Sequence, residues 1–135
     1  MINRMDNKIV ILGQIPSKSN SYRIFTFYDK RAGNYRAGIA KTPDMKKYEK
    51  DFVLQFPSEL KGKNTTTPFR LVMDVYYPDR RQDLDGCLKG FLDCLQAVEY
   101  IKDDRACEDI HIRRYIDKNN PRIEFELIFF KPELF

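Results

Sequence analysis

Hydrophobic and polar positions alternate with a period of two in several short segments of the chain, a pattern that predicts β-strands. The clearest strands are expected over residues 71–77 and 123–129, and shorter ones over 8–12, 22–28, 35–40 and 109–116. The segment DKRAGN between two of them is typical of a hairpin loop. Several strands of mixed length therefore form the framework of the predicted fold.

Two other segments repeat their apolar residues every three to four positions, which is typical of amphipathic helices. The first covers 44–56 and ends before Pro57. The second covers 84–98, so Leu84 at its start is expected to face the core. The order β-β-β-α-β-α-β-β predicts a single α/β (α+β) domain over residues 1–135, with two helices packed on one face of a mixed β-sheet.

The composition suits one ordinary globular domain: 135 residues, of which 42% are hydrophobic and 33% are charged. No apolar run is long enough to cross a bilayer, and the start MINRMDNKIVILG lacks the layout of a signal peptide. We therefore expect a cytoplasmic protein with no membrane partner.

Three cysteines are too few for a disulfide framework. On a helix, Cys87 and Cys94 would lie roughly 10 Å apart along the axis, too far to share one zinc ion. Buried thiols are the favoured interpretation of both, and a structural role is favoured for His111, the one histidine in the chain.

Positive charge is concentrated in the first half of the chain. Residues 1–70 carry 14 Lys or Arg and 6 Asp or Glu, a net +8, whereas residues 71–135 carry 10 and 14, a net −4. This division fits an enzyme that grips a polyanion with one part and binds cations with another. A mixed surface without a partner would give the same counts.

The stretch PDRRQDLDGCLK, residues 78–89, places carboxylates among basic residues where a strand gives way to the second predicted helix. Asp83 and Asp85 straddle that junction and can converge on one point. Lys89, four residues past Asp85, is expected on the same helical face and can reach the same neighbourhood. Mg²⁺ is commonly bound by one or two carboxylates together with phosphate oxygens. The alternative is a helix N-cap with an ordinary surface salt bridge from Lys89 to Asp85 or Asp93.

A second acidic pair, Asp103 and Asp104 in YIKDDRAC, follows the same predicted helix. It can join the first pair only if the chain doubles back, and it is also compatible with plain turn chemistry.

These motifs together resemble the RusA family of Holliday-junction resolvases, small metal-dependent endonucleases of bacteria and phages. The family pattern is approximately D-R-R-x-D-L-D-N-x-x-K, then an amphipathic helix, then a loop with D-D. Residues 78–107 match it in order and separation, and IPSKSNSYR at 15–23 is similar to the family's early loop. The resemblance implies three metal-binding carboxylates, a helper carboxylate, a catalytic lysine and four DNA-binding cations: respectively Asp83, Asp85 and Asp104; Asp103; Lys89; and Arg80, Arg81, Lys18 and Arg23.

The function implied by this resemblance is a Mg²⁺-dependent endodeoxyribonuclease, with Mn²⁺ as a possible substitute. It would resolve Holliday junctions in DNA recombination and repair, as a bacterial or phage-encoded protein. Because a junction is cut on two strands, a homodimer making paired symmetric nicks is expected, with the C-terminal run LIFFKPELF as one candidate interface.

One departure from the family pattern is Gly86, which stands where the family usually has asparagine. If that asparagine orders the outer shell of the metal, its loss would weaken binding or change the metal preference. Three alternative functions follow from the residues: an inactive protein of the same fold that binds junction DNA, a Mg²⁺-dependent binder of nucleotides or other phosphate esters, and a pure interaction domain. Against the second alternative, the sequence has no glycine-rich phosphate loop of the Walker type.

Overall fold

The computed structural model of the chain describes residues 7–130, which form six strands in two sheets, three α-helices and two short 3₁₀ helices. The main sheet has four strands in the order β1-β6-β4-β5. Their bounds are Ile9–Leu12 (β1), Arg122–Phe129 (β6), Phe69–Tyr77 (β4) and Cys107–Ile116 (β5). Only β4 and β5 run parallel, so the sheet is mixed, as the sequence predicted.

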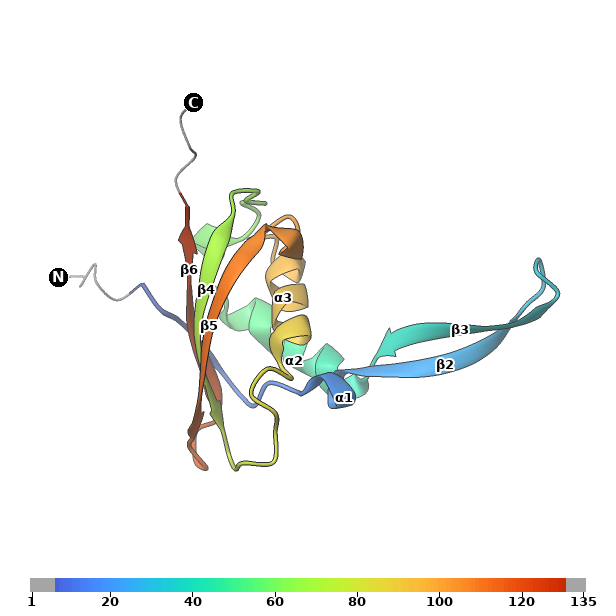
Figure 1. Cartoon of the computed structure of the whole chain (residues 1–135), viewed down its shortest axis with the longest axis horizontal. Helices are drawn as coiled ribbons and strands as arrows, with labels where there is room; N and C mark the ends of the chain where they lie inside the picture. Colours follow the sequence, from blue (N-terminus) through green and yellow to red (C-terminus); the bar gives the residue numbers. More distant parts are fainter. Residues whose placement is uncertain (1–6, 131–135) are drawn as a thin grey trace.

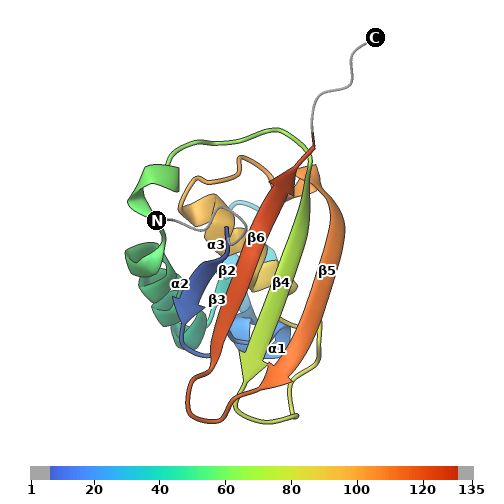
Figure 2. The same cartoon turned by 90° about the vertical axis from the view of Figure 1, so that its left-hand side faces the viewer.

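Two helices, α2 (Pro43–Gln55) and α3 (Leu88–Ala97), cover one face of this sheet, and Figure 2 looks onto the other face. The alternation of β4 explains the arrangement, because every second residue from Phe69 to Tyr77 is buried beneath the helices. The predicted α+β domain with helices on one face is therefore confirmed. No helix within residues 7–130 is long and apolar enough to cross a bilayer.

Aromatic rings from both helices and the sheet meet in the core. Phe52 of α2 and Phe91 of α3 both pack on Phe125 of β6, with ring centroids 6.2 and 4.7 Å away. The two helices approach closely at Gly90, where an added Cβ would lie 3.2 Å from the thioether of Met45. Helix α3 is thereby fixed against α2 and the sheet.

The beginnings of the two helices differ. Helix α2 starts at Pro43, one residue before the predicted start, and the side chain of the preceding Thr42 accepts a hydrogen bond from the Met45 amide (3.2 Å). Helix α3 starts at Leu88, four residues later than predicted, and residues 80–87 form bends and turns. The expectation that Leu84 faces the core is wrong, since it is 41% exposed. Its apolar side chain fits the helical repeat, but the backbone has not yet become helical there.

Strands β2 (Tyr22–Asp29) and β3 (Asn34–Lys41) pair only with each other, around the predicted hairpin loop. They follow α1 (Lys18–Ser21) and project far from the main sheet as a two-stranded ribbon (Figure 1). The 3₁₀ helices η1 (Ser58–Leu60) and η2 (Asp104–Ala106) lie before β4 and β5. Of the C-terminal run LIFFKPELF, Phe129 packs against the core, and residues 131–135 lie outside the described part of the chain.

Candidate functional site

The acidic and basic loop that joins β4 to α3 is anchored at its start and in its middle. The Asp117 amide donates to the Tyr77 carbonyl at the end of β4 (2.8 Å), and an Arg114 guanidinium N–H donates to the Gln82 carbonyl (2.9 Å). Further along, the Gly86 amide donates to the Asp83 carbonyl (3.4 Å) in a tight turn. The backbone around Asp83 is therefore positioned by β5 as well as by β4.

Asp83 and Asp85 are exposed on this loop. Neither carboxylate makes a hydrogen bond or an ion pair with any residue in the described range 7–130. Neither caps α3, because the N-cap is Cys87 and no side chain bonds to the first turn. The N-cap alternative is therefore excluded, and two exposed carboxylates, separated by one residue in the sequence, remain available to an external cation.

Two further aspartates, Asp79 in the same loop and Asp103 of the second acidic pair, are engaged with arginines in matching arrangements. Asp79 accepts the backbone amide and two guanidinium N–H groups of Arg81, the shortest at 2.7 Å, and Asp103 holds Arg105 in the same way at 2.8 Å. The hydrogen bonds from each arginine lower the pKa of its aspartate, to about 2 for Asp103. Both aspartates stay charged at neutral pH, and their arginines are held in place on the surface.

Asp104 does not lie beside Asp83 and Asp85. It precedes β5, whose first residue Cys107 pairs with Phe69 at the start of β4, whereas the loop carrying Asp83 follows Tyr77 at the end of β4. The nine residues of β4 span about 26 Å. Figure 1 shows the same separation, with the two connections at opposite ends of α3. Within residues 7–130, no three Asp, Glu, His or Cys side chains are grouped closely enough to hold a metal ion.

Lys89 lies in the first turn of α3, in contact with Asp93 and Tyr22. Its Nζ atom is 3.7 Å from the Asp93 carboxylate and 5.2 Å from the centre of the Tyr22 ring. The Tyr22 hydroxyl donates to the same carboxylate, and burial together with this bond raises the pKa of Tyr22. Because Asp85 precedes the helix, the expectation that Lys89 shares a helical face with it is wrong. The salt bridge of Lys89 instead goes to Asp93.

The four predicted DNA-binding cations, Arg80, Arg81, Lys18 and Arg23, are all exposed. Arg80 and Arg81 lie on the β4–α3 loop, Lys18 opens α1, and Arg23 lies near the base of the ribbon. Lys18 is adjacent to Ser17, which together with Asn20, Arg81 and Asp83 lines one hollow of about 370 Å³. Residues 17–20 and the acidic loop therefore lie side by side, although they are about 60 positions apart in the sequence.

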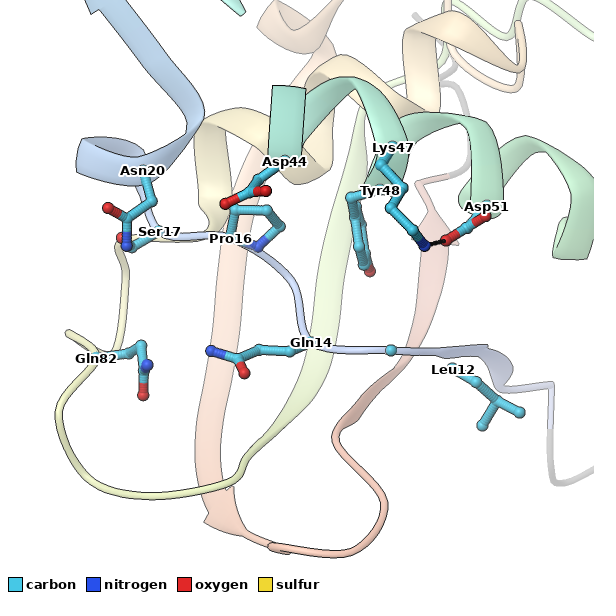
Figure 3. A pocket seen from close by; sticks show the side chains of 11 residues that line it. Leu12, Gln14, Pro16, Ser17, Asn20, Asp44, Lys47, Tyr48, Asp51 and Gln82 are labelled. Atoms are coloured by element: carbon cyan, nitrogen blue, oxygen red, sulfur yellow. Dashed lines mark hydrogen bonds and ion pairs between the residues drawn. The ribbon is translucent and has the colours of Figure 1, made fainter. Parts of the chain in front are cut away.

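A second cavity, of about 330 Å³, adjoins this hollow and shares Ser17, Asn20 and Gln82 with it. Figure 3 shows the side chains of Gln14 and Gln82 extending into the same space below α2. Its lining also includes the carboxylates of Asp44 and Asp51 and a single ammonium group, that of Lys47, which is paired with Asp51 at 2.8 Å. A cavity with this charge balance suits neutral polar groups better than a phosphate.

The cysteines and the histidine do not form a metal site within residues 7–130. Cys87 and Cys94 are buried in the core, and burial raises the pKa of these thiols to about 11 and about 12. His111 lies on β5 with its Nε2 atom 3.4 Å from Asp109. The interpretation of the two thiols as buried core residues is confirmed.

A comparison with protein families matches the chain to a family model described as Endodeoxyribonuclease RusA, over residues 17–128. This match covers well over half of the 135-residue chain. The chain belongs to the RusA endodeoxyribonuclease family. The family resemblance stated from the sequence is thereby confirmed, and membership supports endonuclease activity on branched DNA. No curated protein matches the chain.

The match to the RusA family includes helix α1, the ribbon, and both acidic pairs. Three residues of this region were missed by the sequence analysis as parts of the site: Tyr22, Arg114 and, except as a possible salt-bridge partner, Asp93. The spacing of four residues between Lys89 and Asp93 was a usable signal. Tyr22 and Arg114 had none, because each reaches the site only through tertiary contacts.

Proposed function

We propose that this RusA-family chain is a metal-dependent, structure-specific endodeoxyribonuclease that resolves four-way DNA junctions. It acts in DNA recombination and repair as a homodimer that makes paired symmetric nicks. Mg²⁺ is the expected metal, and Mn²⁺ is a possible substitute. Asp83, Asp85 and Asp104 are the proposed metal ligands, with Asp103 as a helper, and Arg80, Arg81, Lys18 and Arg23 are the proposed contacts to DNA.

The observation that carries this proposal is the state of Asp83 and Asp85. Both carboxylates are exposed, they are separated by a single residue, and they have no partner within residues 7–130. The negative charges of two neighbouring carboxylates repel each other. A cation bound between them attracts both, which lowers the electrostatic free energy of the site. They also supply the hard oxygen ligands that Mg²⁺ prefers. The donor set on this loop therefore fits the metal that the family implies.

When bound, Mg²⁺ supplies a Lewis acid that lowers the pKa of an attacking water and offsets negative charge on the scissile phosphate. The chain's own residues do the positioning. Arg80 and the Asp79-held Arg81 would hold the neighbouring phosphates, because they flank the carboxylates on the same loop. The Arg114 bond to the Gln82 carbonyl keeps this loop in register with the sheet.

Lys89 is the proposed catalytic cation. The Lys89 side chain is about half exposed and lies in the first turn of α3, directly after the acidic loop, where it can contact the phosphate or the leaving oxygen. Its pairing with Asp93 across 3.7 Å is loose enough to release it to a phosphate, while the Tyr22 hydroxyl continues to satisfy the same carboxylate.

Asp104 can share a metal with Asp83 and Asp85 only if it comes from a second chain. Within one chain the length of β4 separates them, whereas Mg²⁺ binds its ligands at about 2.1 Å. A symmetric dimer that places the start of β5 of one chain against the β4–α3 loop of the other would complete two equal sites. Two sites related by a two-fold axis match a junction that must be cut on two strands.

A nuclease assay on four-way junction, duplex and single-stranded DNA, with and without Mg²⁺, tests this proposal. We expect symmetric paired nicks on the junction that disappear with EDTA. Tight junction binding without cleavage would instead support the inactive DNA-binding alternative, for which Gly86 is the motivation. Inhibition by mononucleotides at concentrations that leave junction binding intact would support the nucleotide-binding alternative.

A further inference from the structure

The β2–β3 ribbon carries the whole net positive charge of the chain. Its residues 22–41 include five Lys or Arg and one Asp, a net +4, whereas the other 115 residues include 19 Lys or Arg and 19 Asp or Glu. The ribbon projects from the main sheet, and within residues 7–130 no third strand pairs with it (Figure 1). A projecting arm on which the net positive charge is concentrated is suited to a polyanion.

The two faces of the ribbon carry different side chains, because successive residues of a strand point to opposite sides. The cross-strand pairs of one face are Arg23 with Ala40, Phe25 with Gly38, and Phe27 with Arg36, and those of the other face are Ile24 with Ile39, Thr26 with Ala37, and Tyr28 with Tyr35. We call the first of these the arginine–phenylalanine face. Over these six pairs, cations and aromatic rings occur together on that face alone.

Phe25 and Phe27 form an open aromatic surface on the arginine–phenylalanine face. The two residues are 45% and 44% exposed, and their ring centroids are 5.8 Å apart. Neither ring joins the hydrophobic core of residues 7–130. Gly38 makes room for Phe25, since an added Cβ would lie 2.6 Å from the Cζ atom of that ring. The end of the Phe25 ring therefore occupies the space that a side chain at this position of β3 would fill.

Two guanidinium groups border the aromatic surface. Arg36 lies directly opposite Phe27, and Arg23 precedes Phe25 by two residues on the same face of β2. Both arginines are exposed, and one carboxylate oxygen of Asp29 pairs with Arg36 at 3.1 Å. The other oxygen of Asp29 accepts two backbone amides of the hairpin loop. Positive charge therefore lies at both ends of the pair of rings, at positions that the ribbon fixes.

We propose that the arginine–phenylalanine face binds unpaired nucleotides of DNA, with bases stacked on Phe25 and Phe27 and phosphates held by Arg23 and Arg36. Aromatic rings interleaved with cations hold unpaired strands, because every base has a face that can stack whatever the sequence. Bases within a duplex cover one another, whereas the crossover of a branched DNA interrupts the stack. This inference rests on the proposed function for the identity of the natural substrate, and it deepens that function by assigning a surface that recognises unpaired bases.

The ribbon begins beside the proposed cleavage site. Tyr22, the first residue of β2, contacts Lys89 and Asp93 of α3, and residues 17–20 just before it share a hollow with Asp83. From there the eight residues of β2 extend for about 26 Å. A DNA strand that leaves the cleavage site along this arm meets the arginine–phenylalanine face without a change in the fold.

Indole fluorescence from neighbouring positions on the two faces tests this proposal, because the chain has no tryptophan of its own. Phe27→Trp places the emitter on the arginine–phenylalanine face, and Tyr28→Trp places it on the other face, at residues that are 44% and 54% exposed. Titration with a single-stranded oligothymidylate should quench Phe27→Trp, because a stacked base quenches the indole, and should leave Tyr28→Trp nearly unchanged. Added EDTA keeps metal binding and cleavage out of the measurement.

Phe27→Leu and Tyr28→Leu measure the same contact by affinity. Phe27→Leu should weaken the binding of oligothymidylate about 10-fold, as expected for the loss of one stacked base. Tyr28→Leu should bind as tightly as the wild type. Thermal unfolding of both variants should match that of the wild type, since neither ring belongs to the hydrophobic core of residues 7–130.

Equal quenching of the two emitters, or no quenching of Phe27→Trp when the DNA is bound, overturns the proposal. So does equal weakening by Phe27→Leu and Tyr28→Leu. Emission of Phe27→Trp that changes with protein concentration in the absence of DNA also overturns it, since protein would then cover the face. A ribbon that passes these tests in a chain that cuts no junction leaves this inference intact and refutes the proposed activity. Junction nicking without quenching of Phe27→Trp refutes the role of the ribbon alone.

Discussion

Asp85 lies three residues before the first residue of α3, and Asp104 lies seven residues after its last, so the helix separates two carboxylates that the family motif groups together. The separation follows from strand β4. Asp85 comes after the end of β4, whereas Asp104 comes just before β5, whose first residue pairs with the beginning of β4. The arrangement leaves two of the proposed acidic ligands on one end of each chain and one or two on the other. Several measurable consequences depend on this division.

Asp83→Asn and Asp85→Asn should each abolish junction cleavage and leave junction binding in place. Each substitution removes a ligand charge but little shape, and both side chains are exposed without partners in residues 7–130. The free energy of unfolding should therefore change by no more than about 0.5 kcal/mol. Nicking rates and gel-shift affinities on the same junction measure the two effects. Glu59→Gln, an exposed acid in η1, is the control; near-normal nicking by either aspartate variant would remove that residue from the metal site.

Asp104→Asn should also be inactive alone, yet a mixture of Asp104→Asn with Asp85→Asn should regain activity. If a site combines Asp85 of one chain with Asp104 of the other, a mixed dimer has one doubly substituted site and one intact site. Free exchange would leave about a quarter of all sites intact, and these would make single nicks rather than paired ones. Denaturing gels of junctions labelled on two strands distinguish the products. Two inactive variants that exchange subunits but regain no nicking would show that both carboxylates serve one chain's own site.

Arg80→Ala and Arg81→Ala should weaken binding to all DNA substrates about equally. Each exposed guanidinium is proposed to contact one phosphate, so its loss should lower the slope of log K against log salt by about 0.9. Titrations at four or more salt concentrations give the slope, and Lys50→Ala on the exposed side of α2 serves as the control. Slopes equal to that of the wild type in both arginine variants would place these side chains away from the DNA backbone.

Gly86→Asn should be tolerated and should restore the family residue. An added Cβ at Gly86 would meet Ser17 and Asp83 at 3.5 and 3.7 Å, which is ordinary van der Waals contact, and the backbone there is not in the left-handed region. The unfolding free energy should change by less than about 1 kcal/mol. The Mg²⁺ concentration at half-maximal nicking should fall if the amide orders the outer shell of the metal.

Gly90→Asn provides the contrast to Gly86→Asn. Its Cβ would lie 3.2 Å from Met45 in the α2–α3 contact, so overpacking should cost about 1–3 kcal/mol. Equal destabilisation by both substitutions, measured by urea unfolding, would show that the loop at Gly86 is as tightly packed as the helix interface.

Arg105→Ala should raise the pKa of Asp103 from about 2 toward the ordinary value for aspartate. The folded-state pKa is depressed by the arginine, so the associated stability is fully present above about pH 4 and is lost as the pH falls toward 2. The variant should therefore show a weaker dependence of Tm on pH in that window. Carboxyl NMR titration gives the pKa of Asp103 directly. As a control, Asp103→Asn removes the titrating group and should weaken the dependence of Tm on pH to the same extent. Adding Arg105→Ala to that variant should then change this dependence no further.

The sequence predicted the elements that a local pattern of residues specifies. It did not predict features that depend on contacts between segments far apart in the chain or on a local turn. The stripe of Met45, Tyr48 and Phe52, with Thr42 and Pro43 before it, specified α2 to within one residue at each end. The start of α3 was predicted too early because Leu84 fits the helical repeat. The turn closed by the Gly86 amide delays the helix to Leu88. Periodicity alone does not register such a turn.

The candidate site was likewise predicted only in part. Residues within the motif could be named because their order and spacing are themselves the signal. Their separation in space could not be foreseen, since the parallel pairing of β4 with β5 sets which ends meet. The isolation of the ribbon was also hidden, because strands that alternate apolar and polar residues look alike whether they join the main sheet or stand apart from it.

The buried thiols allow the opening of the core to be followed in the unlabelled protein. Cys87 borders the acidic loop, Cys94 lies in the core cluster on α3, and burial keeps both in the unreactive thiol form at neutral pH. An alkylating reagent can modify them only when α3 leaves the sheet, whereas the half-buried Cys107 reacts without that movement. The ratio of the two rates reports how often the helix that carries Lys89 detaches, and any ligand that clamps this helix should slow the first rate and spare the second.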